Sequence, residues 1–140
     1  MKSIYNWKKA TVADLESDGF LDVATKLHVL GFQMNEKDVM VFNGSKESER
    51  IVKFFQWHID NEVPIVMHNG ISFDVPLMEK LFNIDLSKLM LIDSLAISWY
   101  LNFDRRLHGL GTFHENYGIE KPPVEDWSEQ PYEVYEHRVK

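Results

Sequence analysis

The chain has 140 residues, the length of a single domain that can bury a substantial core. It contains no cysteine, which excludes disulfides and thiolate metal sites, so any metal ion must be bound through oxygen or imidazole ligands. The formal net charge of −7 argues against a basic clamp around long nucleic acid, although it is compatible with an enzyme that holds only a strand end.

Three antiparallel strands are expected at the start of the chain. Residues 11–16 form the first, "GFLDVAT" turns the chain, and "KLHVLGFQM" and "DVMVFN" follow as two strands joined by the turn "NEK". Ser45 then suits the N-cap of a helix, because acidic residues stand in the following turn and apolar residues recur at helical spacing from Ile51.

Helices and strands alternate in the second half. "VPIVMHN" has the pattern of a buried parallel strand, "SFDVPLMEKLFN" of a helix, and "KLMLID" of a fifth strand that enters the helix "SLAISWYLN". A basic loop "DRRLHGL", a glycine-interrupted helix "HGLGTFHENYGI", an extended linker "EKPPVEDW" and a short helix in "SEQPYEVYEHRVK" complete the chain. This order predicts one α/β domain over residues 1–140, with a ribonuclease H-like mixed sheet of three antiparallel and two parallel strands flanked by helices.

Two carboxylates stand two positions apart in the first expected strand. Side chains of a strand alternate between its faces, so Asp14 and Glu16 share one face, with Cα atoms roughly 6.6 Å apart. Two neighbouring anions in a half-buried strand repel each other and lose hydration unless a cation compensates. Such oxygen ligands suit Mg²⁺ or Mn²⁺, whereas a solvated acidic face is the alternative interpretation.

A third carboxylate follows the expected fourth strand. "MHNGISFDVPLMEKLF" places Asp74 near a helix N-terminus, where backbone N–H groups stabilise an anion and capping alone is a sufficient explanation. In an open mixed sheet, however, this strand can lie beside the first, and ligand sites gather where neighbouring strands end. We therefore expect Asp14, Glu16 and Asp74 to converge.

Four segments carry a family likeness. "VADLESDGFLDVATKLHVLGF", "MHNGISFDVPLMEKLF", "LIDSLAISWYL" and "HGLGTFHENYGIEKPPVEDW" follow one another in the chain. In this order they resemble the proofreading 3′-to-5′ exonuclease domain of bacteriophage-type family A DNA polymerases, which belongs to the DEDD exonuclease superfamily. The likeness covers nearly the whole chain.

The resemblance implies a two-metal nuclease. Asp14 would bridge two Mg²⁺ or Mn²⁺ ions, Glu16 would bind the ion that activates water, and Asp74 would hold the other ion through water. Such ions sit roughly 3.5–4 Å apart and stabilise the attacking and leaving oxygens of an in-line displacement at phosphorus. The expected reaction releases nucleoside 5′-monophosphates from the 3′ end of single-stranded DNA, with a polymerase domain or polypeptide as the expected partner.

The family's third motif adds a general base and a fourth aspartate. The matching base in "YEVYEHRVK" is His137, since a histidine titrates near neutral pH and can take a proton from the attacking water. An ordinary surface histidine is the alternative. The chain ends at Lys140 without the fourth aspartate, so we expect an exonuclease domain that stops just short of its last catalytic residue, with impaired activity.

Further residues are expected to contact nucleic acid. Phe20 or Leu21 could stack on the terminal base, with core packing as the alternative. His68 and Asn69 could position the loop before Asp74 or contact the nucleic-acid strand, although Asn-Gly is also an ordinary turn sequence.

Three further charged residues lie at the end of the fifth expected strand and in the basic loop that follows the next helix. Asp93 is expected to cap a helix or to support the metal ligands from behind. Arg105 and Arg106 could meet phosphates, or form a solvated loop.

Two alternatives to a DNA exonuclease stay open. The chain could be an inert exonuclease-like module that binds strand ends or a polymerase partner, and an RNA substrate is compatible with the same chemistry. "MKSIYNWKKA" lacks the apolar segment of a signal peptide, and no run reaches the roughly 18 apolar residues of a membrane span. We therefore expect no membrane partner and a cytoplasmic location, in the host cell if the source is viral.

Overall fold

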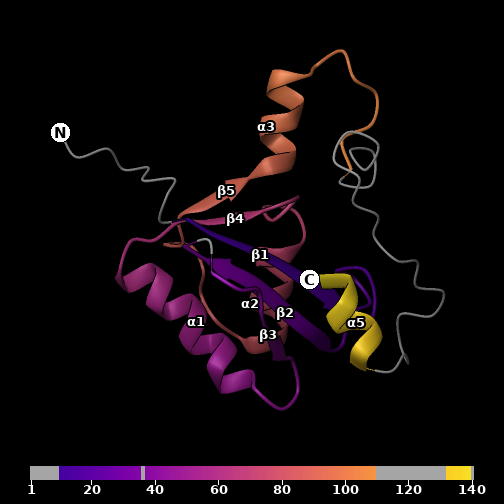
Figure 1. Ribbon diagram of the computed structural model, residues 1–140. Helices are drawn as coiled ribbons and strands as arrows, with labels where there is room; N and C mark the ends of the chain where they lie inside the picture. The colour runs from indigo at the N-terminus through magenta and orange to yellow at the C-terminus, as the bar shows by residue number, and fades with distance from the viewer. Residues whose placement is uncertain (1–9, 36, 110–131, 140) are drawn as a thin grey trace.

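The computed structural model describes residues 10–35, 37–109 and 132–139, which form a mixed sheet with helices on both faces (Figure 1). The elements, in chain order, are β1 (Thr11–Ser17), β2 (Leu27–Met34), β3 (Met40–Asn43), α1 (Ser48–Asp60), β4 (Ile65–Met67), α2 (Asp74–Phe82), β5 (Leu91–Asp93), α3 (Ser94–Leu101) and α5 (Tyr132–Val139). None of the helices in this part of the chain is long and apolar enough to span a bilayer.

The five strands lie in the order β3-β2-β1-β4-β5. β1 pairs antiparallel with β2, and β2 with β3, whereas β4 runs parallel to both β1 and β5. The predicted sheet of three antiparallel and two parallel strands is confirmed. The predicted helix in residues 108–119 and the linker in 120–127 fall almost entirely outside the described residues.

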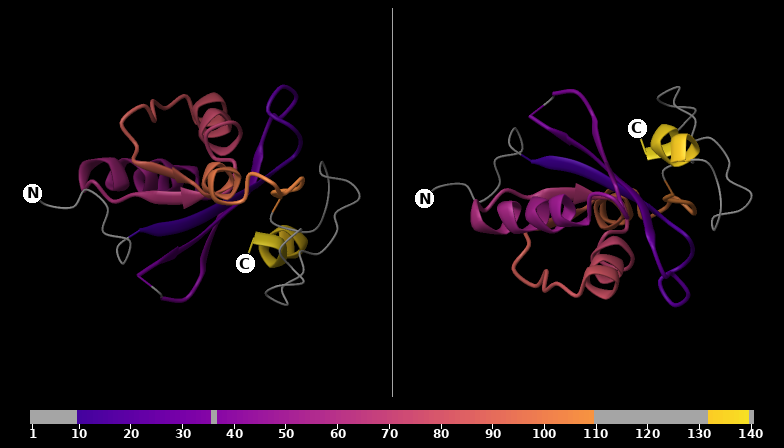
Figure 2. Two further views of the ribbon diagram at one scale, coloured as in Figure 1. Left: turned by 90° about the horizontal axis from the view of Figure 1, so that it is seen from above. Right: turned by 90° about the horizontal axis from the view of Figure 1, so that it is seen from below.

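The main core lies on one face of the sheet. Strand alternation sends Ala13 and Leu15 of β1 to this face, where they meet apolar side chains of α1 and α2. The fully buried members of this core include Leu30, Ile51, Phe55, Ile65, Met67, Leu77 and Met78. Figure 2 shows α2 and α5 on opposite sides of the sheet.

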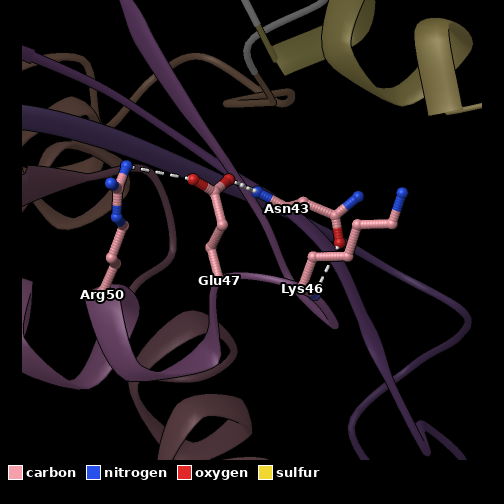
Figure 3. Close-up of polar contacts among 4 residues, drawn as sticks. All are labelled: Asn43, Lys46, Glu47 and Arg50. Carbon is pink, nitrogen blue, oxygen red and sulfur yellow. Dashed lines mark hydrogen bonds and ion pairs between the residues drawn. The ribbon is translucent and has the colours of Figure 1, made fainter.

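The turn before α1 is organised by Asn43 (Figure 3). Its side-chain oxygen accepts from the backbone N–H groups of Ser45 (3.0 Å) and Lys46 (2.9 Å), and its own N–H donates to the Glu47 carboxylate (2.7 Å). Glu47 also meets Arg50 at 3.3 Å. The helix begins only at Ser48, so the prediction of Ser45 as N-cap is wrong: the Asn43 amide takes the N–H groups of the turn instead.

A buried polar contact joins α1 to the start of β1. His58 Nδ1 lies 2.7 Å from the Phe54 carbonyl oxygen, and His58 Nε2 lies 2.7 Å from Thr11 Oγ1. Because a carbonyl can only accept, Nδ1 carries the proton and the Thr11 hydroxyl donates to Nε2. Burial lowers the pKa of His58, and the bond to Phe54 offsets this only partly, so the folded protein holds a neutral imidazole here.

Candidate active site

Asp14 and Glu16 lie on the sheet face opposite the main core. They alternate with Ala13 and Leu15, which belong to that core. Glu16 is only 5% exposed and its Oε1 atom is fully enclosed, whereas Asp14 is half-buried. The structure thus confirms that the two carboxylates share a face.

The same two carboxylates lie beyond the parallel pairing of β1 with β4. That pairing joins Thr11 to Ile65 and Val12 to Val66, and β4 ends at Met67. The pair therefore sits where the parallel strands end, at the sheet edge where ligand sites of open α/β sheets gather.

Asp74 is the first residue of α2 and is 3% exposed. It follows β4 after a six-residue loop, at the same end of the parallel strands. Its backbone position at a helix N-terminus agrees with the prediction, and the partial positive charge of that terminus favours a carboxylate there.

The described side chains do not form a three-ligand metal group. Over the part of the chain that the structure describes, no three or more His, Asp or Glu side chains are arranged so that they could hold an ion. Asp14 and Glu16 project from the face opposite the core on which α2 packs, and Asp74 begins α2 at the end of the parallel strands. The chemistry of the donors nevertheless fits a hard cation, because all three candidates are carboxylates.

The last turn of α5 lies beside Asp14. A Cβ atom built on Gly31 would fall 2.7 Å from Cγ1 and 2.8 Å from Cγ2 of Val139, so α5 closely approaches the bare backbone of β2. Gly31 is the direct strand partner of Asp14, and directly paired residues project from the same face. α5 therefore covers the face that carries the carboxylate pair.

An aromatic stack holds the middle of α5. The rings of Tyr135 and His28 lie 3.8 Å apart and nearly parallel, and Tyr135 is 2% exposed. The predicted helix at the end of the chain is confirmed, and it includes His137. The side chain of His137 lies outside the described part, so its role as base stays a prediction.

Asp93 is the N-cap of α3, which confirms the first of its two predicted roles, helix capping. Its carboxylate accepts from the N–H of Leu95 at 2.9 Å. It also accepts from the N–H groups of Asn69 (2.9 Å) and Ile71 (3.2 Å), in the loop between β4 and α2. The sequence did not indicate these two bonds, because they depend on β5 lying beside β4.

The two apolar candidates after β1 differ in exposure. Phe20 is 80% exposed, whereas Leu21 packs against the main core. Lys80 of α2 donates to the Leu21 carbonyl at 2.8 Å, and the backbone N–H of Thr25 donates to the Asp18 carboxylate at 2.9 Å. These bonds hold the turn between β1 and β2 in place. Phe20 is thus the more exposed of the two, and its contact with a base stays a prediction.

His68 and Asn69 begin the loop that leads to Asp74. His68 Nδ1 lies 3.0 Å from the Ser94 hydroxyl, and its Nε2 is enclosed, without a hydrogen-bond partner within the described part of the chain. Asn69 has a left-handed backbone conformation with φ of 64°. Both residues therefore shape the loop, and a contact with nucleic acid stays a prediction for each.

Arg105 and Arg106 lie in the loop after α3. The Arg105 Nε donates to the Leu107 carbonyl at 2.9 Å, and the Arg105 carbonyl accepts from His108 Nε2 at 2.8 Å. His108 Nδ1 in turn accepts from the Ser98 hydroxyl at 2.8 Å, which folds the loop back onto α3. Arg105 thus has a local structural role, and the exposed side chain of Arg106 is the more accessible cation.

The family model described as the RNase_H superfamily matches residues 12–125. The chain belongs to the RNase_H superfamily. The matched region contains Asp14, Glu16, Asp74 and Asp93. Comparison with curated proteins finds no match.

Several solved structures share the fold of this RNase_H-superfamily protein. NrnC of Brucella melitensis, bound to pGG, has a TM-score of 0.68 at 18% identity over 99% of this chain and 71% of that chain. The catalytic core of RRP6 from Trypanosoma brucei has 0.65 at 13%, over 99% and 42%. Escherichia coli RNase D, an exoribonuclease involved in structured RNA processing, has 0.57 at 18%, over 94% and 36%. NrnC has also been solved with bound Mg²⁺.

Proposed function

We propose that this protein is a metal-dependent 3′-to-5′ exonuclease that releases nucleoside 5′-monophosphates from single-stranded ends, with DNA and a proofreading context as the first candidates. One observation carries the proposal: Asp14 and Glu16 share the α5-covered face where the parallel strands end, and Asp74 begins α2 at the same end. Membership of the RNase_H superfamily supports it.

Asp14, Glu16 and Asp74 would hold the divalent ions, Mg²⁺ or Mn²⁺, two in number. Such ions supply Lewis-acid stabilisation of the phosphate and an activated water. The enclosure of Glu16 keeps bulk water from that carboxylate, which strengthens its attraction for a cation. His137 on α5 would accept the proton of the attacking water.

The exposed ring of Phe20 would stack on the terminal base. It stands on the turn that directly follows the strand of Asp14 and Glu16, and it is 80% exposed. Base–aromatic stacking contributes roughly 1–3 kcal/mol and tolerates every base, which suits an enzyme that removes nucleotides without regard to sequence. Arg106 would add a contact with a phosphate further along the bound nucleic acid.

Release of mononucleotides from a 5′-labelled single strand, with Mg²⁺ or Mn²⁺ and then with a chelator, tests the proposal. Asp14→Asn should lower the rate by at least roughly 10–100-fold. That is the loss typical when a residue that only supports a metal ligand is removed, and Asp14 is proposed as a ligand itself. Asp38→Asn, an exposed aspartate in the loop between β2 and β3, is the matched control and should cut like the wild type. Cleavage that survives Asp14→Asn would refute the assignment.

RNA is the second candidate substrate, favoured by RNase D, an exoribonuclease that shares the fold. DNA and RNA strands of identical sequence, compared in the same assay, separate the two. Faster release from RNA by the wild type, abolished by Asp14→Asn, would assign the RNA activity to the same site.

An inert strand-binding module is a candidate of another class. The observation that favours it is that, within residues 10–35, 37–109 and 132–139, no three side chains form a metal group. Strand binding without cleavage in Mn²⁺ would establish this function, and cleavage would exclude it.

A further inference from the structure

The carboxylate of Asp93 connects two elements that are distant in the chain. Asp93 Oδ1 accepts from the N–H groups of Leu95 and Asn69, both at 2.9 Å, and Oδ2 accepts from the N–H of Ile71 at 3.2 Å. The residue is 8% exposed. One buried side chain therefore caps α3 and also holds the loop between β4 and α2, residues 68–73.

The loop that Asp93 holds is bonded to both neighbours of Asp74. The carbonyl of Asn69 accepts from Phe73 N at 3.0 Å, and the carbonyl of Gly70 accepts from Val75 N at 2.9 Å. Phe73 and Val75 flank Asp74 in the chain. A displacement of residues 69 and 70 would therefore move the backbone on each side of Asp74.

The loop has a constrained shape. Asn69 has the left-handed conformation, which few residues other than glycine adopt, although asparagine tolerates it better than most. A Cβ atom on Gly70 would fall 2.8 Å from Met67 Cβ and 3.2 Å from Leu91 Cδ1, so the loop is pressed against β5. Hydrogen bonds to a buried carboxylate are strong enough to keep such a conformation.

We propose that Asp93 is a positioning residue that sets the place of Asp74 through the loop of residues 68–73. It acts by accepting the N–H groups of Asn69 and Ile71 and does not itself bind the cation, because its oxygens are directed at backbone donors. The part that concerns cation binding rests on the proposed function. The bond between His68 and Ser94 is a second, weaker tie of the same loop to α3.

Three substitutions of Asp93 separate its bonds. Asp93→Asn keeps Oδ1 for Asn69 and Leu95, but places an NH₂ group opposite the N–H of Ile71. Asp93→Ser keeps the cap on Leu95 and is too short to reach the loop. Asp93→Ala removes all three bonds, and Asp85→Asn, an exposed aspartate in the preceding loop, is the matched control.

Amide hydrogen exchange reads the positioning directly, without metal or substrate. Each lost bond to the carboxylate should speed exchange on the order of tenfold or more. Asp93→Ser should release Asn69, Ile71 and, through Gly70, Val75, while Leu95 stays protected. Asp93→Ala should release Leu95 as well, and Asp93→Asn should release mainly Ile71. Unchanged exchange of Val75 in Asp93→Ser would overturn the proposal.

Calorimetric titration with Mn²⁺ then tests the consequence for the site. Asp93→Ser should bind Mn²⁺ roughly 10–100-fold more weakly than the wild type, with Asp93→Asn between them and Asp85→Asn unchanged. Wild-type affinity in Asp93→Ser together with fast exchange at Val75 would overturn the positioning role. A wild type that takes up no Mn²⁺ would refute the proposed function, and the exchange of Val75 would still decide the proposal on Asp93.

Discussion

Replacing Gly31 by alanine tests how α5 is seated on the face that carries Asp14. The added methyl group would lie 2.7 Å from Cγ1 and 2.8 Å from Cγ2 of Val139, closer than carbon atoms approach one another. Overpacking of this kind typically costs about 1–3 kcal/mol in the free energy of unfolding. Because Gly31 pairs directly with Asp14, the displaced turn of α5 is the one beside the carboxylate pair, and nuclease activity should fall as well.

A second substitution isolates the clash. Val139→Ala removes both methyl groups and leaves Cβ 3.2 Å from the methyl of Ala at position 31, a tight but tolerable contact. The double variant should therefore recover most of the loss caused by Gly31→Ala, with a coupling energy of about 1–2 kcal/mol. Gly109→Ala is the control, since an added Cβ there meets nothing within 4 Å.

Urea unfolding of the wild type, the two single variants, the double variant and the control gives these free energies. Costs that simply add in the double variant would show that Gly31 and Val139 do not touch. The stated packing of α5 on β2 would then be refuted.

Three further predictions concern stability, each measured by urea unfolding. The pKa of His58 is lowered by burial, so protonation favours the unfolded chain: stability should fall as the pH drops below about 6.5, by up to ~1.4 kcal/mol per unit, and His58→Gln should abolish this slope. A slope unchanged by the substitution would place the titration elsewhere. Gly44→Ala should cost about 3 kcal/mol or more, because its Cβ would overlap the backbone carbonyl of Leu27, which cannot rotate away; a cost no larger than that of Gly109→Ala would contradict this. Asn43→Ala should cost about 1 kcal/mol through the turn before α1, and an exposed Lys46→Ala should be neutral by comparison.

Much of the fold follows from local patterns. The two-residue alternation around Asp14 identified the faces of β1, and the apolar run within residues 63–69 identified a buried parallel strand, which the structure places at Ile65–Met67. The start of α1 was misplaced because Asn43, the last residue of β3, provides the turn with a side-chain acceptor that Ser45 was expected to supply. Such competition between neighbouring polar residues depends on backbone angles that a pattern does not specify.

The site was predictable only in part. The carboxylates can be picked out from their positions at strand and helix ends, but how Asp74 lies relative to Asp14 and Glu16 depends on how α2 packs on the sheet, which no local pattern specifies. The bonds of Asp93 to the loop required the order of β4 and β5. Gly31 carries a signal in the sequence, since a glycine inside a strand often marks the close approach of another backbone element.

The position of β1 in the sheet also bears on the order of folding. On one side β1 is joined by β2 through a short connection, and on the other by β4, which lies far downstream in the chain. Nearby segments find each other quickly, whereas contacts between distant segments form slowly because a long loop must close first. The antiparallel half can therefore assemble early, and the parallel pairing of β1 with β4, beyond which Asp14 lies, is among the last regions to be completed. Pulse labelling during refolding should show protection of Leu30 and Phe32 before that of Thr11, whose N–H donates to the Pro64 carbonyl at the junction of β1 with β4.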